Sequence, residues 1–237
     1  MFPIHDENPV RIVPYVTYAF MVGCILAFVW QITQTPELQN AIVYALGVIP
    51  AVLFGGFELD SELVWVPPIS TVFTSMFLHG GWMHLIGNML YLWVFGNNIE
   101  AAMGHVKFFL FYVLCGAAAV LAQALPDTGS QIPMIGASGA ISGVLGAYIL
   151  LYPMARVTVF IPIVIMLYRM KIPALFVLGI WFVMQLFSSF TSSSEGGGVA
   201  FGAHIGGFIA GMIFIPLFKY PTIPLQIPFV HFNPLRR

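Results

Sequence analysis

Four polar residues lie inside apolar stretches of this sequence, and their types are those of nucleophilic and acid–base chemistry. His84 and Asn88 occur in the segment HGGWMHLIGNMLYLWVFG, Ser138 lies near the start of GASGAISGVLGAY, and His204 lies in FGAHIGGFIAGM. A serine within reach of a histidine forms a nucleophile–base pair, because the histidine can take the hydroxyl proton during attack on a carbonyl and return it to the leaving amine.

Such an attack also needs hydrogen-bond donors for the oxyanion that develops on the carbonyl. His84 and Asn88 are four residues apart, so they share one helix face and can point at the same place. The backbone N–H of Ser138 is a third candidate donor, because amides in the first turn of a helix have no intrahelical partner. No acidic residue in the apolar stretches can orient His204, so the sequence predicts a dyad and not a triad.

Each of these residues also has a simpler interpretation. A serine in a helix often bonds its own backbone, an asparagine can join two helices, and a buried histidine can relay protons or bind a ligand. His79 lies near the expected surface, as a structural residue or a minor contributor. It is five residues from His84, not on the same helix face, and the chain has no HExxH motif, so a metal site is not favoured.

The composition shows what kind of protein must position these residues. Of the 237 residues, 59% are hydrophobic and 7% are charged, whereas soluble domains carry about a quarter charged residues. A soluble fold is therefore excluded, and the chain is predicted to be an all-α polytopic membrane protein. A net charge of −1 without a basic tract gives no support for nucleic acid binding. Cys24 and Cys115 lie in apolar runs and are expected to be buried free thiols.

Six apolar segments are long enough to cross a bilayer and form one membrane domain over residues 1–237. They lie at about 14–32, 80–97, 105–125, 135–152, 172–190 and 199–219. Two shorter apolar runs, 41–54 and 157–168, each contain a proline and are expected to be interfacial or re-entrant. The segment 33–79 becomes a long loop, and the serine- and glycine-rich stretch at about 188–198 becomes a mobile loop.

The positive charges predict how these segments are oriented. With six spans, all eight basic residues fall on one side, which is typical of the cytoplasmic side. They are Arg11, Lys107, Arg156, Arg169, Lys171, Lys219, Arg236 and Arg237. Both termini are therefore expected to be cytoplasmic, with the 33–79 loop facing outward. The N-terminal residues have none of the features of a signal or transit peptide, so we expect none there.

This topology brings the polar residues together. The second, fourth and sixth spans all begin at the outer face, and at about 1.5 Å per residue Ser138, His204 and Asn88 lie roughly 5, 8 and 12 Å below it. Small residues at helical spacing also form stripes on the fourth and sixth spans, which allow close backbone approach. The stripes are Gly139, Gly143 and Gly146 on one span, and His204, Gly207 and Gly211 on the other. If they face each other, Ser138 and His204 meet.

At these positions the sequence resembles the rhomboid family of intramembrane serine proteases, over roughly Pro14 to Lys219. The family's GxSG pattern is Gly136-Ala137-Ser138-Gly139, and its AHxxGxxxG pattern begins at Ala203-His204. Its HxxxN pattern is His84 and Asn88, with His79 upstream. The resemblance implies a six-helix core without a cofactor, with Ser138 as nucleophile and His204 as base. It implies an oxyanion hole formed by His84, Asn88 and the Ser138 amide, a mobile cap at 188–198, and a structural role for Glu100.

The sequence departs from the family pattern at two places. The first outer loop has Trp65-Val66 where many members have Trp-Arg. Ser142 stands four residues after Ser138, where many members have a tyrosine that stacks on the histidine. Ser142 can either hydrogen-bond His204 or act as a small packing residue. What holds the His204 ring is left open, with Tyr148 or an aromatic residue from another helix as candidates.

The function predicted from these observations is that of an intramembrane serine endopeptidase, a hydrolase that cleaves transmembrane proteins within or next to their spans. The resemblance implies transmembrane substrates and membrane lipids as partners, while the sequence predicts nothing about oligomeric state. Short flanking segments and the resemblance favour a prokaryotic plasma membrane. A silent relative that escorts membrane proteins, and a transporter with a polar path through His84, Asn88 and His204, are the alternatives. A transporter usually has broken helices at the midplane, whereas the polar residues here lie in the outer half of the membrane, which disfavours a transporter.

Overall fold

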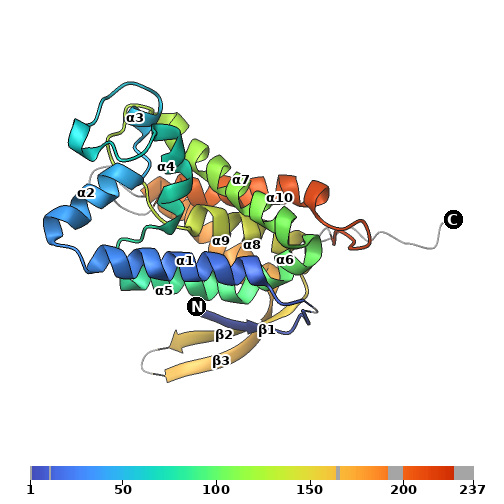
Figure 1. Ribbon diagram of the computed structural model, residues 1–237. Coiled ribbons are helices and arrows are strands. Elements are labelled where there is room, and N and C mark those ends of the chain that lie inside the picture. Colours follow the sequence, from blue (N-terminus) through green and yellow to red (C-terminus); the bar gives the residue numbers. More distant parts are fainter. Residues whose placement is uncertain (1, 11, 164–165, 192–199, 227–237) are drawn as a thin grey trace.

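The computed structural model describes residues 2–10, 12–163, 166–191 and 200–226. These residues form a helical bundle with a small sheet along one side, below α1 and α5 in the view of Figure 1. The α-helices are α1 Tyr15–Ile32, α2 Pro36–Leu46, α3 Pro50–Leu53, α4 Pro68–Thr74, α5 Trp82–Tyr91, α6 Asn97–Met103, α7 His105–Ala124, α8 Ser138–Leu151, α9 Ala174–Thr191 and α10 Phe201–Phe218. The strands are β1 Phe2–Asp6, β2 Arg156–Ile163 and β3 Met166–Pro173.

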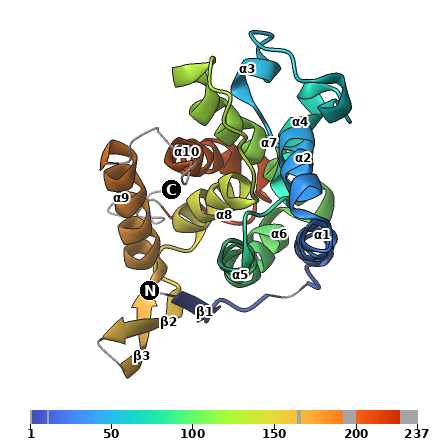
Figure 2. The same cartoon turned by 90° about the vertical axis from the view of Figure 1, so that its left-hand side faces the viewer.

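Helix α8 lies in the middle of the bundle (Figure 2). Eleven of its fourteen residues are buried, which fits a helix that is apolar or small on every side. Helices α5, α6, α7 and α10 surround it, and α9 stands at the outer edge beside α10 (Figure 2). The helix that begins at Ser138 is therefore held by packing on most of its circumference.

Each of the six apolar segments contains helix in the structure. The second is helical from Trp82 to Met103, because α5, a π-helical turn at Leu92–Gly96 and α6 follow one another directly. Among the described residues, α1, the helical stretch His105–Asp127 and α10 are long and apolar enough to cross a membrane, and α8 and α9 are shorter apolar helices. The count of six spans stays a prediction.

Glu100 ties the start of α1 to α6. Its side chain is fully buried, and its two carboxylate oxygens accept hydrogen bonds from the backbone N–H groups of Val16 and Thr17 at 2.9 and 2.7 Å. It also accepts from the Thr17 hydroxyl at 2.6 Å and contacts His105 Nδ1 at 2.5 Å. The carboxylate therefore supplies acceptors for the unpaired amides at a helix N-terminus, which is the structural role that the resemblance implied.

The expectation of an all-α protein is wrong at residues 2–6 and 156–173. There β2 pairs with β1 on one side and β3 on the other, all antiparallel. The apolar run 157–168, expected to be interfacial or re-entrant, thus lies in the two paired strands β2 and β3. The sequence of β2, RVTVFIPI, is rich in β-branched residues, which favour strands. Pro162 is tolerated because β1 pairs with β2 only as far as Phe160.

The sheet is fastened to the helices through Asp6. This buried carboxylate accepts hydrogen bonds from Asn98 Nδ2 at 2.8 Å and from the Tyr148 hydroxyl at 2.6 Å. Burial raises the pKa of the Asp6 carboxyl above its ordinary value, and the hydrogen bond from Tyr148 opposes that shift. At the sheet surface Lys171 Nζ pairs with Glu7, and this hydrogen bond lowers the pKa of the Glu7 carboxyl.

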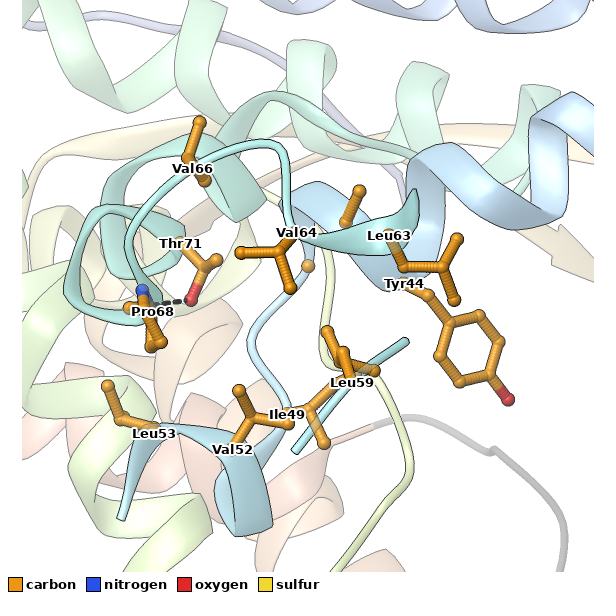
Figure 3. A pocket seen from close by; sticks show the side chains of 12 residues that line it. Tyr44, Ile49, Val52, Leu53, Leu59, Leu63, Val64, Val66, Pro68 and Thr71 are labelled. Atoms are coloured by element: carbon orange, nitrogen blue, oxygen red, sulfur yellow. Dashed lines mark hydrogen bonds between the residues drawn. The ribbon is translucent and has the colours of Figure 1, made fainter. Parts of the chain in front are cut away.

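The long segment 33–79 folds as α2, α3, a 3₁₀ turn at Ser61–Leu63 and α4, which enclose a small apolar pocket (Figure 3). Thr35 caps α2, and Thr71 lines the pocket with its hydroxyl bonded to Pro68 O at 2.6 Å. The segment is also joined to the chain before α8, because Val48 and Met134 exchange two backbone hydrogen bonds of 3.0 and 2.7 Å. The cysteines, Cys24 and Cys115, are buried and free, as expected.

Candidate functional site

Ser138 and His204 meet at the first turns of α8 and α10. The Ser138 hydroxyl lies 2.7 Å from His204 Nε2, which is hydrogen-bond distance. Both residues are half-buried, so they are held by the fold and remain accessible from outside it. The geometry is that of a nucleophile and its general base.

Close contact of two helix backbones brings the pair together. A Cβ atom on Gly207 would lie 2.1 Å from Gly139 O, and one on Gly211 would lie 1.9 Å from Gly143 O. The glycine stripes of α8 and α10 therefore face each other, which is the condition under which the sequence pattern brings Ser138 and His204 together. Only hydrogen atoms fit at such contacts, so the spacing of the two helices depends on these glycines.

The residues that precede α8 are fixed by the loop region. Gly136 donates its backbone N–H to Ser75 O at 2.9 Å and adopts a φ angle of +121°, a conformation that favours glycine. A Cβ atom at position 136 would lie 2.7 Å from His84 Cε1 and Nε2. The glycine of the GxSG pattern thus provides both the turn into α8 and the room for the His84 ring.

His84 and Asn88 lie one helical turn apart on α5, and the His84 ring faces this turn. His84 Nδ1 accepts a hydrogen bond from the Gly80 N–H at 3.3 Å. The proton of the neutral ring therefore resides on Nε2, beside Gly136. Asn88 is buried, and its Nδ2 group has no hydrogen-bond partner among the described residues. A buried donor without an acceptor is expensive, and Asn88 Nδ2 is one of five buried side-chain polar atoms without a partner among the described residues.

His79 differs from its expected position, since it is fully buried and not near the surface. Its Nδ1 lies 3.1 Å from Phe77 O, and its ring meets the His84 ring edge to face with centroids 5.0 Å apart. His79 therefore packs behind His84 and contributes to the position of that ring. The described residues contain no group of three or more His, Cys, Asp or Glu side chains placed to hold a metal ion.

The second nitrogen of His204 has a partner that the sequence reasoning missed. His204 Nδ1 lies 2.8 Å from Gln185 Oε1, and Gln185 Nε2 donates to Trp181 O at 3.5 Å. Both Gln185 and Trp181 belong to α9. The available signal was the same as for Asn88, a polar side chain inside an apolar run, here 172–190. Which neighbour it would meet depended on the rotation of α9, which the sequence pattern does not define.

The candidates for holding the His204 ring can now be separated. Ser142 donates its hydroxyl to Ser138 O at 2.6 Å, so it bonds its own helix and is a buried packing residue. Tyr148 bonds Asp6 beside the sheet. The rings nearest to His204 are Trp181, with centroids 5.9 Å apart, and Phe201, at 6.3 Å and edge to face. The proposed cap, 188–198, lies largely outside the described residues, because 192–199 are not described.

These features define a class, a helical membrane protein with a serine–histidine pair at the meeting of two glycine-packed helices. A family model for the rhomboid domain matches residues 67–221, which include α4 to α10 and all the site residues. The chain therefore belongs to the rhomboid family, and it is an integral membrane protein.

Several curated proteins are similar to the chain over part of their length. RHOMBOID-like protein 5 of Arabidopsis thaliana is 32% identical over 138 residues, which are 58% of this chain and 40% of that protein. Rhomboid protein 1, mitochondrial, of Saccharomyces cerevisiae is 27% identical over 73% of this chain and 52% of that protein. Rhomboid protease GluP of Bacillus subtilis is 40% identical over 74 residues, 31% of this chain and 14% of that protein. The chain thus spans about half or less of the relatives it matches.

Proposed function

We propose that this protein is an intramembrane serine endopeptidase that cleaves transmembrane proteins within or next to a membrane-spanning segment. The observation that carries the proposal is the 2.7 Å contact between Ser138 Oγ and His204 Nε2 at a half-buried position between two close-packed helices. Membership of the rhomboid family supports it, as does the word protease in the name of the Bacillus subtilis relative.

In the proposed reaction Ser138 Oγ attacks the carbonyl carbon of the scissile peptide while His204 Nε2 takes its proton. The C–N bond then breaks as His204 returns this proton to the leaving amine, which leaves an acyl group on Ser138. Water enters next, gives a proton to His204 and attacks the acyl carbon, and Ser138 recovers its proton as the acid product leaves. The reaction therefore consumes one water molecule and needs no other co-reactant.

The negative oxygen formed in each attack needs donors, and three groups are candidates. Asn88 Nδ2 is a buried donor without a partner among the described residues, and His84 Nε2 carries its proton beside Gly136. The backbone N–H of Ser138 lies in the first turn of α8, where amides are free of intrahelical bonds. We assign these three groups to the oxyanion hole.

The substrates follow from the setting of the site. A transmembrane helix shields its own carbonyls by hydrogen bonds, so it must unwind locally before Ser138 can reach one. Small or helix-breaking residues near the cleavage point favour this unwinding. The site must also admit water, because deacylation consumes it. The partners we propose are therefore transmembrane proteins, met in the plane of the lipid bilayer.

We also propose six spans, with both termini on the cytoplasmic side and the site near the outer face. Pairing of β1 with β2 supports this topology, because it brings the N-terminal residues alongside the 156–173 connection, which the charges place on the same side. The relatives include proteins named for mitochondria as well as one from a bacterium, so they do not favour a prokaryotic plasma membrane over an organelle membrane.

The experiment that tests the proposal needs no known substrate. The full chain is purified in detergent and treated with a fluorophosphonate probe, which modifies activated serines, beside Ser138→Ala and His204→Ala variants. We expect labelling of Ser138 in the unchanged protein and none in either variant, with all three proteins unfolding at similar temperatures. Absence of labelling in folded protein, in detergent and again in liposomes, contradicts the protease proposal and leaves the escort function in its place.

A further inference from the structure

We infer that Gln185 is a positioning residue for the catalytic base, so that the working unit of this protein is Ser138, His204 and Gln185. The inference rests on the proposed function, because it assigns His204 the role of base. It goes beyond that function because it makes α9 part of the catalytic machinery. Gln185 acts through His204 and does not contact the reacting atoms.

The hydrogen-bond pattern determines which nitrogen of His204 carries the proton. Gln185 Nε2 donates to Trp181 O, which leaves Oε1 as the acceptor for His204 Nδ1–H at 2.8 Å. Nε2 is then unprotonated and faces Ser138 Oγ at 2.7 Å. A base must present its free lone pair to the nucleophile, and this is the tautomer that does so. The amide of Gln185 therefore selects the competent form of the imidazole.

The same bond holds the plane of the ring. The position four residues after the nucleophile is Ser142, whose hydroxyl is engaged with Ser138 O and cannot stack on an imidazole. Trp181 and Phe201 contact the ring at centroid distances of 5.9 and 6.3 Å, one tilted and one edge to face. Neither ring forms a close parallel stack on the imidazole. Among the described residues, the contact that can set both the direction and the tautomer of His204 is the bond to Gln185.

A neutral amide suits this environment. An aspartate at this place would carry a charge into an apolar helix, which is expensive in a membrane, whereas a glutamine accepts the same hydrogen bond without a charge. Gln185 is half-buried, and Phe182, on the same helix, stacks on Phe208 of α10 at a centroid distance of 4.5 Å. This stack keeps α9 against α10, so the acceptor and the histidine are held by one packed pair of helices.

The inference is tested by the kinetics of labelling of Ser138 with a fluorophosphonate probe on the full chain in detergent. Gln185→Met keeps the length of the side chain but removes the amide acceptor. Gln185→Glu restores an acceptor at the same distance. Met184→Leu is the matched control, because Met184 is the adjacent residue on α9 and is 60% exposed. Each variant is measured over a range of probe concentrations and pH values, and its unfolding temperature is recorded.

We expect Gln185→Met to lower the maximal labelling rate about tenfold, the size of effect that follows from losing one neutral hydrogen bond, with little change in the half-saturating probe concentration. Gln185→Glu should restore the maximal labelling rate at high pH. The pH below which labelling slows should be higher than in the unchanged protein, because a carboxylate beside Nδ1–H stabilises the protonated ring. Met184→Leu should behave as the unchanged protein.

Three results separate the possible failures. If the unchanged, folded protein is not labelled at Ser138, the proposed function fails. If it is labelled and Gln185→Met reacts at the same maximal rate, Gln185 does not position the base. If Gln185→Met is slow but unfolds at a much lower temperature, and Gln185→Glu does not restore the rate, the residue is structural and the inference is overturned.

Discussion

Two residues of the candidate site, Asn88 and Gly136, have features that usually cost stability. Asn88 holds a buried amide donor without an acceptor among the described residues, and such a group costs about 1–3 kcal/mol. Gly136 adopts a φ angle of +121° next to the His84 ring. In the proposed reaction the first of these costs is recovered, because the oxyanion accepts the hydrogen bond that Asn88 lacks in the resting protein. On this proposal the unsatisfied donor is preorganised for a charge that exists only during the reaction.

Gly136→Ala tests this arrangement at the residue scale. The added Cβ meets His84 Cε1 and Nε2 at 2.7 Å. The change also places an alanine at positive φ, which costs about 1–2 kcal/mol. We expect a loss of stability of that order and a drop in Ser138 labelling of at least tenfold, because His84 must move. Gly55→Ala is the control, since Gly55 has φ of +75° and open space around it. It should lose similar stability and keep full labelling, and equal labelling of both variants would contradict the role of His84.

At the scale of elements, the sequence was enough where the pattern was repeated and local. Glycines at spacings of three and four predicted the contact of α8 and α10, because only close-packed helices need such stripes. The sequence was not enough where the contact of a side chain depends on how its segment is rotated in the fold. Examples are Gln185 on α9, which contacts His204, and His79, which packs behind His84. The sheet was missed because RVTVFIPI was assessed by length and charge, although its β-branched residues indicated a strand. Its partner strand β1 lies at the other end of the sequence, where no local pattern points to the pairing.

The packing of α8 against α10 gives a prediction at this scale. Gly211→Ala places a Cβ 1.9 Å from Gly143 O, a backbone atom that cannot rotate away, so the helices must separate. We expect a loss of stability of about 1–3 kcal/mol and slower Ser138 labelling as the distance to His204 increases. Gly179→Ala on α9 is the control, because a Cβ there meets nothing within 4 Å and should be neutral or slightly stabilising. Unchanged unfolding of Gly211→Ala in detergent would show that the two helices are not held this closely.

At the scale of the whole molecule, the two end segments of the described chain gather at one end of the bundle. The N-terminal strand β1 pairs with β2, and after α10 the chain bonds to the ends of α6 and α8, through Tyr220 N to Ala102 O at 2.8 Å and Gln226 N to Leu150 O at 2.7 Å. Lys107 lies over the Tyr220 ring at 5.7 Å. Lys107 and Lys219 therefore lie at this end, opposite to the helix starts at Ser138 and Phe201. The proposed topology places this end on the cytoplasmic side, where the positive-inside rule expects basic residues.

That topology is tested by the accessibility of single cysteines to a membrane-impermeant maleimide. Thr222→Cys lies after α10, whereas Ser61→Cys and Thr128→Cys lie in two of the three loops expected on the outer side, and all three positions are exposed. The native Cys24 and Cys115 are buried and should contribute little background. In sealed vesicles of right-side-out orientation we expect labelling of positions 61 and 128 and protection of position 222, with the reverse in inverted vesicles. Labelling of positions 61 and 222 from the same side would rule out both the six-span count and the placement of the site near the outer face.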